Sequence, residues 1–176
     1  MGAGGPPGRP GSLAGWRDGD ERGGTRIVWL VPFTLCIDAD VLFAGAAGPS
    51  EQRASLLVLR MAEITLIDAV TSQQAVTEAE RNLATKLPQA IPAFRLIISR
   101  CVRIVPDPAP EDLEPYTGLA NPEDLPLLVA AVREGCSWLI TFNVRHFRPA
   151  HPSVTVLRPG DFVMRVREML TMMEEP

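Results

Sequence analysis

The 176-residue sequence is poor in cysteine and histidine, with three Cys and two His. The cysteines Cys36, Cys101 and Cys136 show no CxxC spacing. So few soft ligands in that arrangement disfavour a structural zinc site. An odd number of cysteines, two of them within apolar runs, favours reduced and buried thiols over a disulfide framework. The composition therefore predicts a cytoplasmic protein.

The sequence also lacks a long apolar segment and an excess of positive charge. Its most apolar run, residues 27–37, is far too short to span a bilayer, and no signal-peptide cleavage site follows it. We therefore interpret this run as an internal strand and expect no membrane association. The formal net charge of -4 and a pI near 5.2 argue against a globally basic nucleic-acid binder. A local basic rim around an acidic pocket stays compatible with these values.

What the sequence does have is enough apolar content, 46%, for one α/β domain with a sizeable core. Residues 1–25 differ from the rest, since they are rich in Gly, Pro and Arg. Such a segment cannot bury enough apolar surface to offset its ordering entropy. We expect residues 1–25 to form a disordered N-terminal extension and residues 26–176 to form a single domain.

Strand and helix patterns alternate along this domain, which predicts parallel pairing and right-handed crossovers. Expected strands lie near residues 31–37, 64–70, 101–105, 138–141 and 154–157. Expected helices lie near residues 49–61, 72–87, 92–100, 112–116, 121–134 and 159–172. Ser72 is a good N-cap, Pro88 and Gly135 are stop signals, and Glu123 and Asp124 are expected in the first turn of their helix.

Acidic side chains follow the first predicted strand directly. Asp38 and Asp40 come after a buried apolar run, where desolvation of a carboxylate must be compensated. Because ligands bind at the carboxyl ends of parallel strands, Asp38 is a candidate metal ligand. The alternative is that one acid is a solvated turn residue and the other caps a helix, and for Asp40 this alternative is the better interpretation.

Three further polar residues occupy comparable places in the predicted layout. Glu78 lies in the helix after the second strand, Asp124 at a helix start, and Asn143 after the fourth strand. Together with Asp38 they form an all-oxygen set suited to Mg²⁺ or Mn²⁺. Since clustered carboxylates repel each other, such a site favours a bound cation.

Residues 34–165 resemble a PIN domain, the metal-dependent nuclease fold of many toxins in prokaryotic toxin–antitoxin pairs, the VapC-like proteins. The resemblance depends on the order and spacing of several short stretches: 37–42 (IDADVL), 71–78 (TSQQAVTE), 81–83 (RNL), 123–131 and 139–147 (LITFNVRHF). It implies a three-layer α/β/α sandwich with a central, mostly parallel, roughly five-stranded sheet. It also implies hydrolysis of RNA phosphodiesters by metal-activated water, leaving a 5′-phosphate and a 3′-hydroxyl.

Carried over to this sequence, the resemblance assigns catalysis to Asp38, Glu78, Asp124 and Asn143, the first three of them as metal ligands. The family spacing selects Glu78 over Glu80, a choice that helical geometry alone leaves open. Two positions depart from the family pattern. Asp40 replaces a common Asn, and the neutral Asn143 fills the last acidic position, which puts binding of a second metal and full activity in doubt.

A phosphate-binding rim is suggested by Arg145, His146 and Arg148, together with Arg81 one turn beyond Glu78. Ordinary surface charge explains these residues equally well. Ser72 is a further candidate for the site, although its N-cap role accounts for it. The expected partners are an RNA substrate, a cognate antitoxin protein and a second copy of the chain.

Two alternatives remain open. A PIN fold without efficient catalysis would act as an RNA- or protein-binding module, as Asn143 suggests. An Asp-x-Asp after a buried strand also resembles the haloacid dehalogenase-type phosphatases. That chemistry needs a downstream Lys and a later acidic pair, whereas Lys86 is the only lysine and Asp161 has no second acid four residues on.

Overall fold

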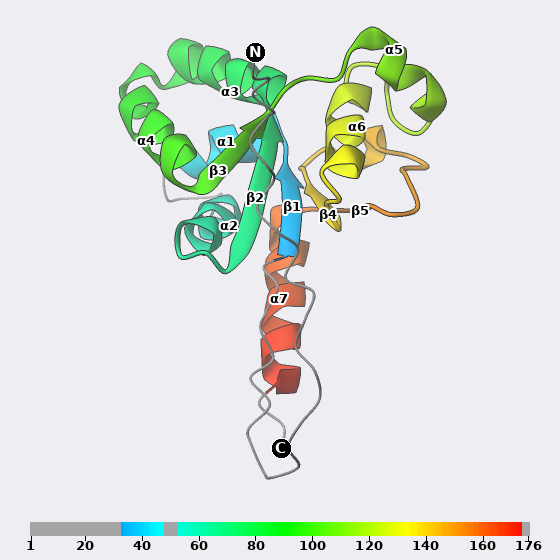
Figure 1. Ribbon diagram of the computed structural model, residues 1–176. Helices are drawn as coiled ribbons and strands as arrows, with labels where there is room; N and C mark the ends of the chain where they lie inside the picture. Colours follow the sequence, from blue (N-terminus) through cyan, green and yellow to red (C-terminus); the bar gives the residue numbers. More distant parts are fainter. Residues whose placement is uncertain (1–32, 48–52, 174–176) are drawn as a thin grey trace, which may run out of the picture. The chain divides into compact units, whose positions relative to one another are not determined.

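The computed structural model describes residues 33–47 and 53–173 (Figure 1). The predicted disordered extension, residues 1–25, lies outside the described residues. That expectation and the domain boundary at residue 26 therefore stay predictions. No helix in the described part of the chain has the length and apolar character needed to cross a membrane.

A five-stranded sheet forms the centre of the fold. Its strand order is β3-β2-β1-β4-β5, and every pair of neighbouring strands is parallel. The strands are β1 (Phe33–Ile37), β2 (Ile67–Ser72), β3 (Val102–Val105), β4 (Trp138–Ile140) and β5 (Thr155–Leu157). The predicted five-stranded sheet of the α/β class is confirmed, and the sheet is parallel throughout.

Helices cover both faces of the sheet and give the three-layer α/β/α sandwich that the resemblance implied. The helices α1 to α4 pack on one face and α6 on the other, while α7 contacts α2 (Figure 1). Their bounds are α1 (Ala39–Ala46), α2 (Arg53–Glu63), α3 (Gln73–Lys86), α4 (Ile91–Cys101), α5 (Pro110–Leu113), α6 (Leu125–Arg133) and α7 (Pro159–Met173). Short 3₁₀ helices are η1 (Pro88–Ala90), η2 (Glu114–Tyr116) and η3 (Val144–His146).

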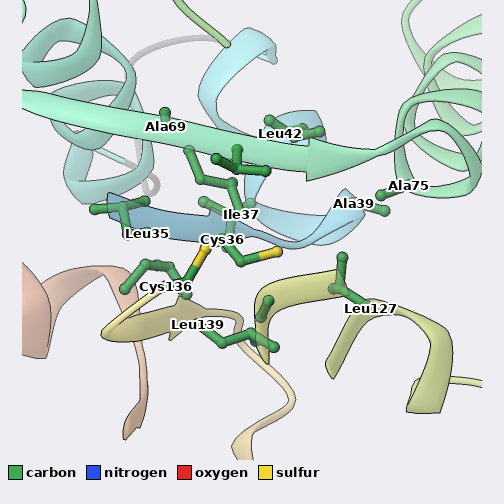
Figure 2. Close-up of a cluster of buried hydrophobic side chains, with 14 of the residues drawn as sticks. Leu35, Cys36, Ile37, Ala39, Leu42, Ala69, Ala75, Leu127, Cys136 and Leu139 are labelled. Carbon is green, nitrogen blue, oxygen red and sulfur yellow. The ribbon is translucent and has the colours of Figure 1, made fainter. Parts of the chain in front are cut away.

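The core is built around β1, which is central in the sheet. Leu35, Cys36 and Ile37 are each 0% exposed, as expected for a parallel strand covered on both faces. Figure 2 shows Leu42 of α1 on one side of β1 and Leu127 of α6 on the other. The continuous apolar run that marked this strand in the sequence is therefore the consequence of burial from both layers.

Several of the local signals act as predicted. The Ser72 hydroxyl caps α3 by accepting a hydrogen bond from the Ala75 N–H at 3.1 Å. The helix ends just before Pro88, and Gly135 follows α6 with a φ of +67°, the left-handed conformation that glycine adopts most readily.

Several boundaries differ from the expectation, among them those of β2, which spans Ile67–Ser72 and not residues 64–70. Two further differences lie beside the acidic residues Asp38 and Asp124. The sequence analysis placed no helix at residues 39–46, because so short an apolar segment shows no clear period; α1 begins there, immediately after Asp38. The helix α6 begins at Leu125, so Glu123 and Asp124 precede its first turn instead of lying within it. A turn over residues 121–124, held by the Asp124 N–H to Asn121 carbonyl bond at 3.0 Å, occupies the predicted helix start.

All three cysteines are free. Cys36 and Cys136 are buried, and desolvation raises the pKa of both thiols, to about 12 for Cys136. Cys101 is only half-buried, so the expectation of buried thiols fails there, because this residue ends α4 near the edge of the sheet.

Candidate functional site

The site lies where the chain changes direction in the sheet. From β1 the chain builds outward through β2 and β3, then returns to β4 on the other side of β1. The carboxyl ends of β1 and β4 are therefore adjacent, at the kind of crevice in which open α/β sheets bind ligands. The Asp38 N–H donates to the Ile140 carbonyl at 3.0 Å and joins the two ends.

Three predicted carboxylates, Asp38, Glu78 and Asp124, line one cavity at this edge. Its volume of about 30 Å³ is close to the share of liquid volume taken by one water molecule. The full lining is Asp38, Ser72, Gln74, Ala75, Glu78, Glu123, Asp124 and Leu127. Residues 38, 78 and 124 are distant in sequence, so only the fold places them around a space of this size.

The carboxylate of Asp38 is held by two donors. Its Oδ1 accepts from the Ala39 N–H at 2.6 Å, which caps α1, and its Oδ2 accepts from the Thr141 hydroxyl at 2.7 Å. Burial, and next the charge of Asp40, raise the pKa of Asp38 to about 7 despite these donors. The ionised form of Asp38 is therefore poorly compensated in the protein alone.

Thr141 is the functional candidate that the sequence analysis missed. It is fully buried directly after β4, and its hydroxyl also accepts the Asn143 N–H at 2.9 Å. A polar residue at the carboxyl end of an apolar predicted strand is the signal that would have identified it.

Asp40 faces the same region but does not line the cavity. Its Oδ2 accepts from the Phe142 N–H at 3.0 Å and from the Asn143 side-chain amide at 3.1 Å. Its Oδ1 is buried and has no hydrogen-bond partner among the described residues. Desolvation raises the pKa of Asp40, and the charge of Glu78 adds to this effect. The amide of Asn143 thus contacts Asp40, and Asn143 is not among the residues that line the cavity.

The two glutamates of α3 have different surroundings. Glu78 lines both the acidic cavity and an adjoining groove. Glu80 accepts a hydrogen bond from Arg95 Nε at 2.8 Å and forms a surface ion pair with α4. The structure therefore brings Glu78, and not Glu80, to Asp38 and Asp124.

The expected basic rim is brought together only in part. His146 Nδ1 lies 3.1 Å from Asp124 Oδ2, and Arg81 lines the groove beside Glu78. Arg145 and Arg148 are exposed and are not among the residues that line the cavity.

The sequence predicts a divalent cation at this cavity, and the oxygen ligands around it bear on that prediction. Within the described residues, no three His, Cys, Asp or Glu side chains already form a metal-binding group. The chemistry nevertheless fits a hard cation, because the carboxylates of Asp38, Glu78 and Asp124 all line the cavity. Mg²⁺ is commonly held by one or two carboxylates and retains several waters, so two carboxylates at such a cavity would meet its needs.

Comparison with known proteins identifies the architecture. A family model described as PIN domain matches residues 34–145, more than half of the chain. No curated protein sequence matches the chain.

Several solved structures are similar. VapBC2 from Rickettsia felis, bound to a DNA fragment from its promoter, has a TM-score of 0.50 and 17% identity, covering 72% of this chain and 98% of that chain. PAE2754 from Pyrobaculum aerophilum has a TM-score of 0.54 and 15% identity, with 77% and 96% covered. VapC20 from Mycobacterium tuberculosis, a toxin that cleaves the sarcin–ricin loop, has a TM-score of 0.45 and 16% identity, with 60% and 86% covered.

Proposed function

The chain belongs to the PIN-domain family, whose members include nucleases, and we propose that it is a metal-dependent endoribonuclease that hydrolyses RNA phosphodiesters. One observation carries this proposal. Asp38, Glu78 and Asp124 come from the end of β1, from α3 and from the start of α6, and they line one small cavity at the carboxyl edge of the sheet.

The protein side of the chemistry follows from these positions. Asp38 and Asp124 would hold Mg²⁺ or Mn²⁺, with Glu78 as a third ligand or as the group that orients the attacking water. When bound, the cation acidifies a coordinated water and offsets charge on the phosphoryl group. It would also lower the pKa of Asp38, because an adjacent positive charge favours the ionised carboxylate.

The neighbouring polar groups would position these ligands. Thr141 donates to Asp38 at 2.7 Å and fixes the direction of that carboxylate. Asn143 donates to Asp40 at 3.1 Å, so its contribution is made through Asp40 and not by direct contact with phosphate. His146, 3.1 Å from Asp124, would hold that carboxylate toward the cavity.

Arg81 lines the groove that Glu78 shares, and from there it would contact the scissile phosphate at the cavity. Arg145 is proposed as a more distant contact from η3. Cleavage is expected to leave a 5′-phosphate and a 3′-hydroxyl, as the family resemblance implies.

We further propose that the protein is the toxin of a toxin–antitoxin pair and that a cognate antitoxin covers the acidic cavity. The PIN-domain resemblance and the VapBC2 assembly among the similar structures support this partner. A homodimer stays a prediction. In α2 and α4, Val58, Leu59, Phe94 and Ile98 are buried in the core, whereas Leu57, Ala93 and Leu96 are exposed.

The alternative of a catalytically inert PIN-fold binding module retains one specific argument, the neutral Asn143 at an acidic family position. The phosphatase alternative has no matching arrangement. Its candidate lysine, Lys86, is the last residue of α3, and its ammonium lies 5.3 Å from the centre of the Phe43 ring.

The test is cleavage of total RNA and labelled tRNAs with Mn²⁺, Mg²⁺ or EDTA, together with calorimetric measurement of Mn²⁺ binding. Discrete, metal-dependent cuts that Asp38→Asn abolishes would establish the nuclease. Asp68→Asn, at a surface carboxylate of β2 that pairs with Arg103, is the matched control and should cut like the wild type. Neither cutting nor Mn²⁺ binding by the wild type would favour the inert module.

A further inference from the structure

We propose that the groove beside the acidic cavity is a recognition subsite for an unpaired nucleobase of the substrate strand, read by the side-chain amides of Gln74 and Asn82. This inference rests on the proposed nuclease function and adds to it the feature that selects the cleavage position. Nothing in the sequence analysis assigned Gln74 or Asn82 a role.

The groove adjoins the acidic cavity, because Gln74 and Glu78 line both. Its volume of about 530 Å³ lies within the range of pockets that bind small ligands, roughly 300–1,000 Å³. Its lining consists entirely of polar residues: Gln74, Thr77, Glu78, Arg81, Asn82 and Asp107. A ligand seated in it would extend directly from a phosphate held at the cavity.

One wall of the groove is a face of α3. Gln74, Glu78 and Asn82 are spaced four residues apart, so they lie on the same side of the helix in successive turns. At a rise of 1.5 Å per residue, Gln74 and Asn82 stand about 12 Å apart along the axis. The two amides therefore flank Glu78 on either side along this face.

The other wall is the segment that follows β3. There the Asp107 Oδ1 accepts the Gln74 N–H at 2.9 Å, which ties this segment to the first turn of α3. The wall is thus fixed by a hydrogen bond that joins residues 33 positions apart, and the groove is built by the fold and not by one flexible side chain.

The chemistry of the lining favours a base over the phosphate backbone. Carboxamides offer one acceptor and two donors each, which is how Asn and Gln pair with the edges of bases. The charges in the groove are Glu78 and Asp107 against Arg81, so a second phosphate would face more negative than positive charge. The edge of a base is uncharged and carries both donors and acceptors. It can therefore form hydrogen bonds with the amides, the Thr77 hydroxyl and the carboxylates of the groove. Sequence-specific proteins recognise single-stranded RNA in this manner.

The experiment uses a pool of single-stranded RNAs randomised around the cleavage position, with the products sequenced. The wild type is expected to favour one or two bases next to the cut. Gln74→Ala and Asn82→Ala should flatten that preference by about tenfold, which corresponds to the 1–3 kcal/mol that a good base contact supplies. Gln74 is exposed and Asn82 half-buried in α3, and alanine favours a helix, so both variants should fold. Asn82 lines the groove and not the cavity, so Asn82→Ala should leave Mn²⁺ affinity unchanged.

The matched control is Gln73→Ala, since Gln73 is the same residue type one position earlier and lines neither the cavity nor the groove. It should retain the wild-type preference. An unchanged preference in both Gln74→Ala and Asn82→Ala would overturn the subsite, while cleavage itself would still support the nuclease.

A binding assay separates the two proposals if the wild type cuts nothing. Fluorescence anisotropy then compares labelled oligo(A), oligo(C), oligo(G) and oligo(U) with an abasic strand of equal length. Discrimination among the bases that Gln74→Ala removes and Gln73→Ala keeps would support the subsite without the nuclease. Equal affinity for all five strands would refute the subsite.

Discussion

The hydroxyl of Thr141 donates a hydrogen bond to Asp38 Oδ2 at 2.7 Å and thereby links the carboxyl ends of β4 and β1. The residues are 103 positions apart in the sequence. The same hydroxyl accepts the Asn143 N–H. One buried group therefore positions both Asp38, which follows β1, and the loop that follows β4. This link predicts that Thr141 sets the direction and the acidity of the central carboxylate.

Thr141→Val should therefore weaken Mn²⁺ binding and cleavage together. The change keeps the shape of the side chain and removes the donor to Asp38, a bond of the charged type worth about 1.5–3 kcal/mol. We expect a loss of about tenfold or more in metal affinity on that basis. Calorimetry with Mn²⁺ measures it. Thr141→Ser should recover most of the loss, and Thr155→Val, at an exposed threonine of β5, should change nothing. Equal affinities for Thr141→Val and the wild type would contradict the assignment.

The metal-free protein should lose stability as the pH rises. Asp38 has a pKa of about 7 in the fold against 3.8 for the free side chain, so between these values the folded state binds more protons than the unfolded state. The free energy of unfolding falls through that window and levels off above it, by roughly 4 kcal/mol in total. Urea unfolding in EDTA from pH 4 to pH 8 measures this.

Asp38→Asn is the control for the pH series, because it removes the titrating group and should be the more stable protein at pH 8 without metal. The difference between the two curves isolates Asp38 from the other acids, such as Asp112, whose pKa is lowered by Arg133. Parallel curves for the two proteins would show that Asp38 does not carry the pH dependence.

The paired substitutions Glu78→Gln and Glu80→Gln should have opposite consequences. Glu78 lines the cavity, so its loss should reduce cleavage by about a hundredfold, which is typical for a residue that positions or deprotonates a reacting group. Glu80→Gln breaks only the exposed pair with Arg95, an interaction worth about 0.2–1 kcal/mol, and should leave cleavage intact. Unchanged cleavage in both variants would mean that α3 contributes no catalytic carboxylate.

Asn143→Asp should raise metal affinity and lower the stability of the metal-free protein. The new carboxylate would remove the amide that donates to Asp40 Oδ2. In its place Asp40 would face a like charge. The cost without metal is about 1–3 kcal/mol, and a bound cation would offset it. Thermal unfolding with EDTA and with Mn²⁺ measures both effects. If Mn²⁺ stabilises the Asn143→Asp protein no more than the wild type, then residue 143 does not act on the bound metal.

The local elements were largely readable from sequence because their signals are local. Ser72 and Pro88 bound α3 as expected, and Gly135 ends α6. The helix α1 was not predicted, since its eight residues span little more than two turns and are apolar on most sides. The start of α6 was placed too early, because Glu123 and Asp124 are also compatible with the turn that they form.

The sequence by itself determined that this is a parallel α/β protein with acids directly after a strand, because periodicity, caps and residue chemistry are properties of neighbouring residues. Only the tertiary structure decided which acids meet. Glu78 and Glu80 differ by two positions on one helix, and packing against β2 and α4 turns one to the cavity and the other to Arg95. The roles of Thr141 and Gln74 likewise depend on contacts between residues far apart in the chain, which no local pattern encodes.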